Sequence, residues 1–300
     1  MAEQRDLDFT YTTIDRIFRL SIGETGDYSG AKYDGDFSMT VEEAQQAKHK
    51  FIADSLNIKE GSKVLDMACG WGPFSKYIRG RGATSIGLTL SLGQAEACKK
   101  NGLNVLVKDC RYVKPEDFGI FDAITCIGGL EHFCSIEEWK AEKQEKIYRD
   151  FFRFLYNLLP AGGRFYMQTM VFSKNMIAYE DFDIHAKKGS APHVLALMAK
   201  EFPGSWLPYG PEMVIRNAEP GFKLISQSSG RLDYIETIKQ WRKKFRKFNL
   251  KKYWLYLSLV PKFLTDKEFR HQVEIFRISP NKVCFEQEIM DHYRLVFERV

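Results

Sequence analysis

The chain has 300 residues, enough to bury one large core, and its 44% hydrophobic and 28% charged residues are those of an ordinary globular protein. A net charge of only +5 argues against a nucleic-acid partner. No apolar run approaches the roughly 18–20 residues that cross a bilayer, so no transmembrane segment is expected. The six cysteines form no C-x-x-C pair. We therefore expect reduced thiols and no metal site. We expect the protein in the cytoplasm or at the periphery of a membrane.

The first 60 residues are expected to form an N-terminal helical cap. An amphipathic pattern predicts a short helix over residues 10–21, and a loop rich in Gly, Asp and Tyr follows over residues 26–36. Thr40, with Glu43 three residues later, makes a capping box. It predicts a helix that runs to about residue 56.

From residue 63 the pattern alternates between strands and helices. Strands are predicted over residues 63–67, 84–90, 105–107, 121–127, 163–171 and 222–227, and helices over residues 73–79, 92–100 and 138–159. This spacing predicts an α/β fold with parallel βαβ units and a doubly wound sheet.

Two later segments complete the predicted organisation. Residues 172–218 contain four prolines and interrupt the alternation, so we expect an inserted lid there. A helix over residues 233–248 and an edge strand over residues 293–300 would close a single domain spanning residues 1–300.

The segment Asp66-Met67-Ala68-Cys69-Gly70-Trp71-Gly72 lies between a predicted strand and a predicted helix. Glycines let a ligand approach the backbone closely, and open α/β sheets bind ligands beyond the carboxyl ends of their strands. A dinucleotide fingerprint would need a third glycine, which is missing. Asp66 instead fits the amino group of a methionine moiety. The loop therefore favours S-adenosylmethionine as cofactor over NAD.

Six segments, in order along the chain, carry a more specific signal. They are Tyr28-Ser29 with Met39-Thr40-Val41-Glu42-Glu43-Ala44-Gln45-x-Ala47-Lys48, Asp66 to Gly72, Gly87-Leu88-Thr89-Leu90-Ser91-x-x-Gln94, Gly129-Leu130-Glu131-His132-Phe133, Phe202-Pro203-Gly204-x-x-Leu207-Pro208, and Asp233-Tyr234-x-x-Thr237-x-x-x-Trp241. Together they resemble the cyclopropane-fatty-acid-synthase family, which includes the mycolic acid cyclopropane synthases. The resemblance implies a Rossmann-like class I methyltransferase fold with a seven-stranded, mostly parallel sheet.

The resemblance also implies residue roles around S-adenosylmethionine. Gln94 would bind the ribose hydroxyls. The family's Trp-Glu pair after the third strand is replaced here by Cys110-Arg111, and Asp109 beside it could accept from the adenine amino group. The full set of cofactor-binding residues expected from the loop and the resemblance is Tyr28, Ser29, Asp66, Ala68, Gly70, Gly72, Thr89, Leu90, Gln94, Asp109 and Cys110.

The acceptor half of the site departs from the family pattern. The expected catalytic group is Glu131, His132, Gln168 and Tyr234. In the cyclopropane synthases a Cys follows the Tyr-Ser pair and a His lies on the fifth strand, and both help to hold a bicarbonate thought to act as the base. This chain has Gly30 and Gln168 there, and a Gln cannot pass a proton.

Three functions stay open at this point. The first is methyl transfer, without ring closure, to an apolar or amphipathic small molecule or lipid-like acceptor, at an alkene carbon or an amine. The second is cyclopropane formation on an unsaturated acyl chain with a substitute base. The third is a non-catalytic protein that binds S-adenosylmethionine.

Residues 239–252 are rich in Lys and Arg, interleaved with aromatic residues. Such a run is commonly a solvated helix face. The functional alternative is an acidic partner, namely a lipid head group, a carrier protein or a diphosphate, with the protein possibly peripheral to a membrane. Trp241 and Phe245, four residues apart, are expected to face the core.

Overall fold

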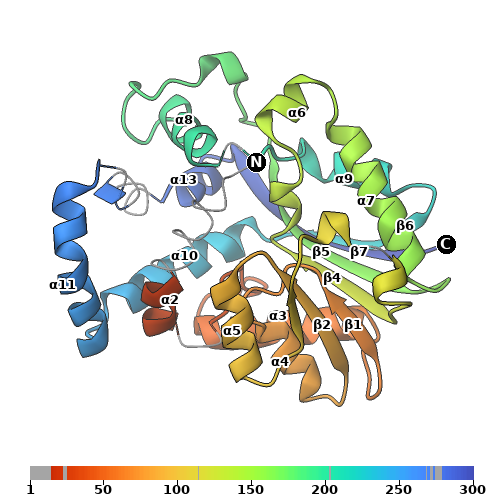
Figure 1. Ribbon diagram of the computed structural model, residues 1–300. Helices are drawn as coiled ribbons and strands as arrows, with labels where there is room; N and C mark the ends of the chain where they lie inside the picture. The colour runs from red at the N-terminus through yellow and green to blue at the C-terminus, as the bar shows by residue number, and fades with distance from the viewer. Residues whose placement is uncertain are drawn as a thin grey trace.

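The computed structural model describes residues 15–22, 26–113, 115–202, 204–267, 269–270, 273 and 279–300 (Figure 1). Seven strands form one sheet in the order β3-β2-β1-β4-β5-β7-β6. Strands β1 to β5 are parallel, and β7 is antiparallel to both β5 and β6. The strand bounds are β1 Lys63–Asp66, β2 Thr84–Thr89, β3 Val105–Val107, β4 Ala123–Ile127, β5 Arg164–Phe172, β6 Phe222–Ser229 and β7 Met290–Arg299. The predicted α/β sheet is confirmed.

The position of the last strand corrects one prediction. The segment from residue 293 was expected at the edge, but β7 lies between β5 and β6, and β6 is the edge. The reason can be read from burial: Leu295, Val296 and Phe297 are consecutive and all buried. A strand covered on both faces reads as an apolar run rather than an alternation.

Neighbouring residues on each strand enter two different cores, because successive side chains point to opposite faces of a sheet. Leu65, Ile124 and Phe165 pack on one face with residues of helices α7 and α9. Val64 and Ala123 pack on the other face with residues of α3 and α4. The sheet is therefore covered on both faces, as a doubly wound fold requires.

The helices mostly follow the predicted spacing. They are α2 Asp15–Ile22, α3 Val41–Ser55, α4 Pro73–Arg79, α5 Leu92–Lys100, α6 Ile136–Lys140, α7 Gln144–Leu158, α8 Ala191–Glu201, α9 Gly210–Ala218, α10 Arg231–Arg246, α11 Leu250–Thr265 and α13 Pro280–Glu286. The long helix expected over residues 138–159 is wrong, because two helices, α6 and α7, occupy that region. Glu142 lies between them with φ at 56°, a left-handed conformation that a continuous α-helix excludes.

The N-terminal and lid segments lie on either side of the sheet's carboxyl edge. The capping box of Thr40 and Glu43 is confirmed at the start of α3, whereas residues 10–14 of the predicted first helix lie outside the described residues. Within the predicted lid, α8 packs on α13, but α9 joins α7 in the helical layer over the sheet. Of the two helices in this segment, α8 therefore belongs to the lid side of the molecule and α9 to the helical layer over the sheet.

Candidate functional site

A cavity of about 650 Å³ opens at the carboxyl ends of the parallel strands. Its walls come from the loops after β1, β2, β3 and β4, from the segment before α3, and from the lid. Among the predicted site residues, those that line it are Tyr28, Ser29, Asp66, Ala68, Gly70, Thr89, Leu90, Gln94, Asp109, Cys110, Glu131, His132, Gln168 and Tyr234. The fold thus brings together residues from positions 28 to 234, as expected for a ligand site of an open α/β sheet.

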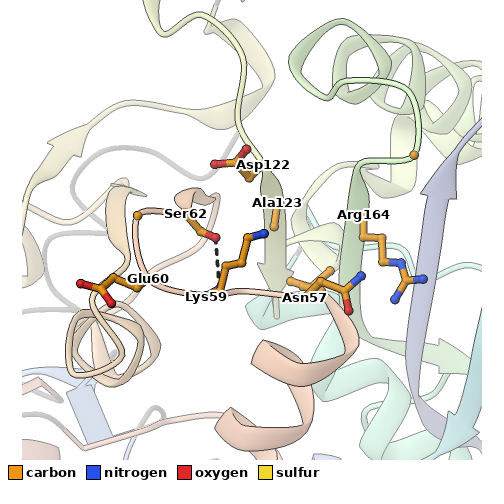
Figure 2. A pocket seen from close by; sticks show the side chains of 10 residues that line it. Asn57, Lys59, Glu60, Ser62, Asp122, Ala123 and Arg164 are labelled. Carbon is orange, nitrogen blue, oxygen red and sulfur yellow. Dashed lines mark hydrogen bonds between the residues drawn. The ribbon is translucent and has the colours of Figure 1, made fainter.

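A second, polar hollow of about 420 Å³ lies at the opposite edge of the sheet (Figure 2). Three of its polar groups are already engaged: Asp122 accepts from the backbone N–H of Lys63, the Ser62 hydroxyl accepts from the N–H of Lys59, and Arg164 pairs with Glu298. It lies at the amino ends of the strands, where open α/β sheets do not bind their ligands. We therefore place the site in the larger cavity.

Asp66 ends β1 with its side chain buried in the floor of the larger cavity. Its carboxyl oxygens accept hydrogen bonds from Thr125 Oγ1 at 3.2 Å and from Ser75 Oγ at 3.4 Å. Burial raises its pKa to about 7 in spite of these bonds. A buried carboxyl whose protein donors are neutral hydroxyls is suited to receive an ammonium group, so Asp66 fits the amino group of S-adenosylmethionine.

The two glycines of the β1 loop serve different purposes. A Cβ placed on Gly70, which has φ at 53°, would meet nothing within 4 Å, so this backbone is open to a ligand. A Cβ on Gly72 would lie 2.4 Å from Leu103 Cδ1 and 3.2 Å from Cys98 Sγ. Gly72 is also not among the residues that line the cavity. It allows α4 to approach α5, a packing role that the motif alone could not separate from ligand binding.

Replacing Gly70 by Leu is expected to weaken binding of S-adenosylhomocysteine by at least about tenfold, or about 1.4 kcal/mol, because the new side chain enters the open space beside the loop. Calorimetric titration measures it. The matched control is Gly61→Leu, since Gly61 also has a positive φ and open space around it but lines the opposite hollow. Equal losses in both variants would mean that backbone strain, and not the cavity, causes the effect.

The predicted pair Tyr28 and Ser29 is held by a buried ionic cluster that the sequence analysis missed. Lys48 Nζ donates to Asp27 Oδ2 and to Ser29 Oγ, both at 2.6 Å, and His49 Nε2 lies 2.8 Å from Asp27 Oδ2. Burial would raise the pKa of Asp27, but Lys48 and His49 outweigh it and hold that pKa well below its usual value. The sequence did contain a signal for this cluster, because three polar residues, Gln45, Lys48 and His49, fall on the face of α3 that is buried.

Two further groups of predicted cofactor residues stand on the other side of the cavity. Thr89 Oγ1 donates to Gln94 Oε1 at 2.7 Å, and no hydrogen bond to a described residue engages the Gln94 amide nitrogen. That nitrogen fits a ribose hydroxyl as acceptor. Asp109 is bound to Arg111, with Oδ2 and Nη2 2.6 Å apart, so part of its accepting capacity is already used.

Glu131 lies directly after β4 with one carboxyl oxygen committed and the other free. Its Oε1 accepts from the backbone N–H of Met170 at 2.8 Å, while Oε2 is buried without a partner among the described residues. Burial raises the pKa of Glu131 to about 7. Its neighbour His132 is tied to the lid, with Nδ1 2.9 Å from Ser205 Oγ, and burial and Arg111 lower its pKa.

Gln168 is held at both ends of its amide. Its Nε2 donates to the carbonyl of Gly30 at 2.9 Å, and its Oε1 accepts from Tyr166 Oη at 2.8 Å. The side chain therefore positions the Gly30 backbone at the cavity wall. Tyr234 packs beside it, and no hydrogen bond between described residues joins Tyr234 to Glu131.

A histidine that lines the cavity escaped the sequence analysis. His292 on β7 is buried, lines the cavity and packs against Tyr234, with ring centroids 4.8 Å apart. The final strand was expected to begin one residue later, at an edge, so His292 drew no attention. An apolar run preceded by a histidine was the only signal in the sequence.

Comparison with known proteins identifies the family. The chain matches the mycolic acid cyclopropane synthetase family over residues 2–256. Hydroxymycolate synthase MmaA4 of Mycobacterium bovis is 30% identical over 246 residues, which cover 79% of this chain and 76% of that protein. Cyclopropane mycolic acid synthase 3 of Mycobacterium tuberculosis is 31% identical over 242 residues, which cover 77% and 78%.

Solved structures show the same fold. The cyclopropane synthase MmaA2 from Mycobacterium tuberculosis superimposes with a TM-score of 0.75 at 23% identity, covering 100% of this chain and 99% of that one. The mycolic acid cyclopropane synthase CmaA1, complexed with SAH and CTAB, gives 0.74 at 23% identity, again covering 100% and 99%. The chain therefore belongs to the mycolic acid cyclopropane synthetase family and is an S-adenosylmethionine-dependent methyltransferase of the class I fold.

Proposed function

We propose that this enzyme transfers a methyl group to an alkene carbon of a lipid-like acceptor. The observation that carries the proposal is the buried Glu131, whose Oε2 has no partner among the described residues and which shares its cavity with an apolar wall. That wall comes from β5 and the lid: Met170, Phe172, Phe182, Leu195, Met198, Trp206 and Leu207. Such a wall suits an acyl chain, and a carboxylate beside it suits a positive charge.

The chemistry explains why those two features belong together. Bound S-adenosylmethionine supplies the methyl group as an electrophile. When an alkene uses its π electrons to bond that methyl carbon, the bond between the methyl carbon and the donor sulfur breaks, S-adenosylhomocysteine is left, and the other alkene carbon becomes a carbocation. The protein must exclude water and stabilise the cation, which aromatic faces and a preorganised carboxylate both do. Glu131 is the carboxylate in this role, and Tyr234 contributes a ring at the same wall.

The fate of the cation separates the proposed reaction from ring closure. The relatives are themselves named for different products, a cyclopropane and a hydroxylated mycolate. Here Gly30 and Gln168 stand where the cyclopropane synthases have Cys and His, and Gln168 is occupied with Gly30 and Tyr166. This favours loss of a proton from a neighbouring carbon, which leaves a methylated alkene, over closure onto the new methyl group.

The test is incubation with S-adenosylmethionine labelled in its methyl group, unsaturated phospholipid, and an amine of similar chain length. We expect label in the lipid, at a carbon that mass spectrometry identifies as a methyl branch. A cyclopropane product would contradict the proposal that the methyl group stays an open branch. Label in the amine alone would contradict the proposal that the acceptor is an alkene. No transfer by folded protein that binds S-adenosylhomocysteine would favour a non-catalytic protein.

We further propose that the turn between α10 and α11 docks on an anionic lipid surface. The basic run over residues 239–252 is not one helix, since α10 ends at Arg246 and α11 begins at Leu250. Lys244 pairs with Glu42, and the buried Lys252 donates to two backbone carbonyls at the end of α10. Lys239 is exposed but pairs with Glu236. The other exposed cations are Lys243, Arg246, Lys247 and Lys251.

Exposed apolar side chains accompany these cations. The exposed fractions are 77% for Phe248, 66% for Trp254 and 61% for Leu257. In Figure 1, α11 stands away from the sheet at one side of the molecule. Cations beside exposed Trp, Phe and Leu are the composition of helices that lie in the interface of an anionic membrane. Among the described residues, no helix has the length and apolar character needed to cross a bilayer.

The double substitution Trp254→Ser with Leu257→Ser is expected to weaken binding to vesicles containing an anionic phospholipid by about tenfold or more, because it removes apolar area from the interface. Co-sedimentation measures it, and Leu232→Ser is the control, since Leu232 is 56% exposed on the first turn of α10. Unchanged vesicle binding would contradict the proposal. The proposal would also be contradicted if light scattering showed a wild-type dimer that the double substitution dissociates and the control does not.

A further inference from the structure

A buried imidazole, that of His292 on β7, lies beside Gln168 of β5 in the wall of the cavity. Strand β7 pairs with β5 so that Gln168 lies opposite Arg294 and Met170 lies opposite His292. Residues directly opposite in an antiparallel pair share a face of the sheet. His292 therefore stands one step along the same face from Gln168, and both line the cavity.

The absence of a side chain at position 30 makes room for this imidazole. A Cβ on Gly30 would lie 3.0 Å from His292 Cε1 and 3.1 Å from Tyr234 Cγ. Both rings thus occupy the space that a larger residue at this position would need. The two departures from the family pattern, Gly30 and Gln168, are explained together. Gly30 leaves room for the His292 ring, and Gln168 holds the Gly30 backbone next to that ring.

His292 is also built to stay neutral and reactive. Its Nδ1 is buried and has no hydrogen-bond partner among the described residues, as is also true of Glu131 Oε2. Arg294 on the same strand and Lys48 on α3 face it, while Asp233 is paired with Arg294, Asp27 is paired with Lys48, and the Asp291 carboxylate accepts from the backbone N–H of His292. Burial, with Arg294 and Lys48, holds the pKa of His292 well below its usual value.

We propose that His292 is a catalytic residue of this enzyme, the base that removes a proton from the methylated acceptor. The inference rests on the proposed alkene acceptor. After the methyl carbon has bonded to one alkene carbon, a neighbouring C–H bond breaks, its electron pair forms the new C=C bond, and the proton passes to an imidazole nitrogen. A proton beside a carbocation is far more acidic than an imidazolium, so a weak neutral base suffices.

Glu131 and His292 have different roles because one is charged and the other is neutral. Glu131 carries the negative charge that stabilises the cation, and it lies on the β4 side, bound to the Met170 backbone. His292 lies opposite Met170, on β7. It takes the proton as a neutral imidazole, so it carries no charge before the transfer. The cations Arg294 and Lys48 disfavour a lasting imidazolium, so the proton passes to water when the product leaves, and the neutral base is regenerated.

The experiment compares wild type with His292→Gln and His292→Ala, and uses His185→Gln, an exposed lid residue, as the control. Turnover on unsaturated phospholipid is measured with labelled donor, and binding of S-adenosylhomocysteine is measured by titration. We expect both His292 variants to lose about 10²-fold or more in turnover, the scale of a lost acid–base group, with donor affinity within about twofold of wild type. Added imidazole is expected to restore part of the activity of His292→Ala.

A readout apart from activity is the titration of the ring itself. ¹⁵N chemical shifts of labelled histidine in wild type, assigned by their loss in His292→Gln, are expected to show a neutral His292 at pH 5.5. A protonated ring there would overturn the proposal, as would wild-type turnover in His292→Gln. A turnover loss in His292→Ala without rescue by imidazole would also overturn it. If wild type itself labels no alkene lipid, the proposed function fails as well. If wild type labels it and His292→Gln does too, only this inference fails.

Discussion

Replacing Glu131 by Gln is expected to lower turnover by about 10²-fold or more, the usual scale for loss of an electrostatic group aimed at a developing charge. The substitution keeps the shape, and the Gln oxygen can still accept from the Met170 N–H. What is lost is the negative charge opposite the carbocation. Single-turnover transfer of labelled methyl to unsaturated phospholipid measures the effect, because it separates the chemical step from product release.

The pH dependence of the wild type gives the same prediction a second readout. Burial raises the pKa of Glu131 to about 7. A carboxyl with a raised pKa is protonated below that value, so the stabilising charge is present above about pH 7 and lost below it. The rate of the chemical step should therefore rise with pH through about 7 in wild type. The Glu131→Gln variant should show no such rise.

Donor binding supplies the control. Glu131 lies at the acceptor side, so its substitution should leave the affinity for S-adenosylhomocysteine within about twofold of wild type. A variant that binds the donor normally and turns over at the wild-type rate would reduce Glu131 to a structural role, holding the loop after β4 to β5. A rate that is equally independent of pH in both proteins would lead to the same conclusion.

The donor half of this site could be predicted from the sequence because it consists of local elements. Asp66, Ala68 and Gly70 lie within one loop, and Thr89 and Gln94 lie five residues apart at one strand–helix junction. Such residues are close in space whenever the strand and helix form. The parallel βαβ units of the sheet also followed from local spacing, since parallel strands joined by helices have few allowed arrangements.

His292, on the acceptor side, could not be predicted, because its place in the cavity depends on pairing between distant segments. His292 meets Gly30 only because β7 inserts between β5 and β6, and its register places it opposite Met170. A one-residue shift in register would turn that side chain to the other face. The packing role of Gly72 was hidden for the same reason, because its neighbours Leu103 and Cys98 belong to the next βαβ unit.

The buried cluster behind Tyr28 and Ser29 leads to the second large prediction. Lys48→Met is expected to destabilise the fold by about 3–5 kcal/mol, because it leaves the Asp27 carboxylate buried without its main counter-ion. The pair itself contributes less than that, since burial lowers the pKa of Lys48 even beside Asp27. The cost therefore comes from isolating one charge, and Asp27→Asn combined with Lys48→Met should be less harmful than Lys48→Met alone.

Urea denaturation measures this difference, with Lys50→Met as the matched control. Lys50 lies two residues along the same helix in an exposed i,i+4 pair with Asp54, so its loss should cost at most about 0.5 kcal/mol. The pH profile gives a further check. Asp27 has its pKa depressed in the folded state, so its stabilising contribution is present above the unfolded value near 3.8 and is lost as pH falls below it.

Wild type should accordingly lose stability below about pH 4 more steeply than the double variant, which lacks both charges. The same cluster should govern the donor site, since Ser29 Oγ is bonded to Lys48 and the Ser29 carbonyl accepts from Gln45 at 2.8 Å. If Lys48→Met were as stable as Lys50→Met, the Asp27 carboxylate would have to reach water or bind a proton, and the loop carrying Tyr28 would have to move with it.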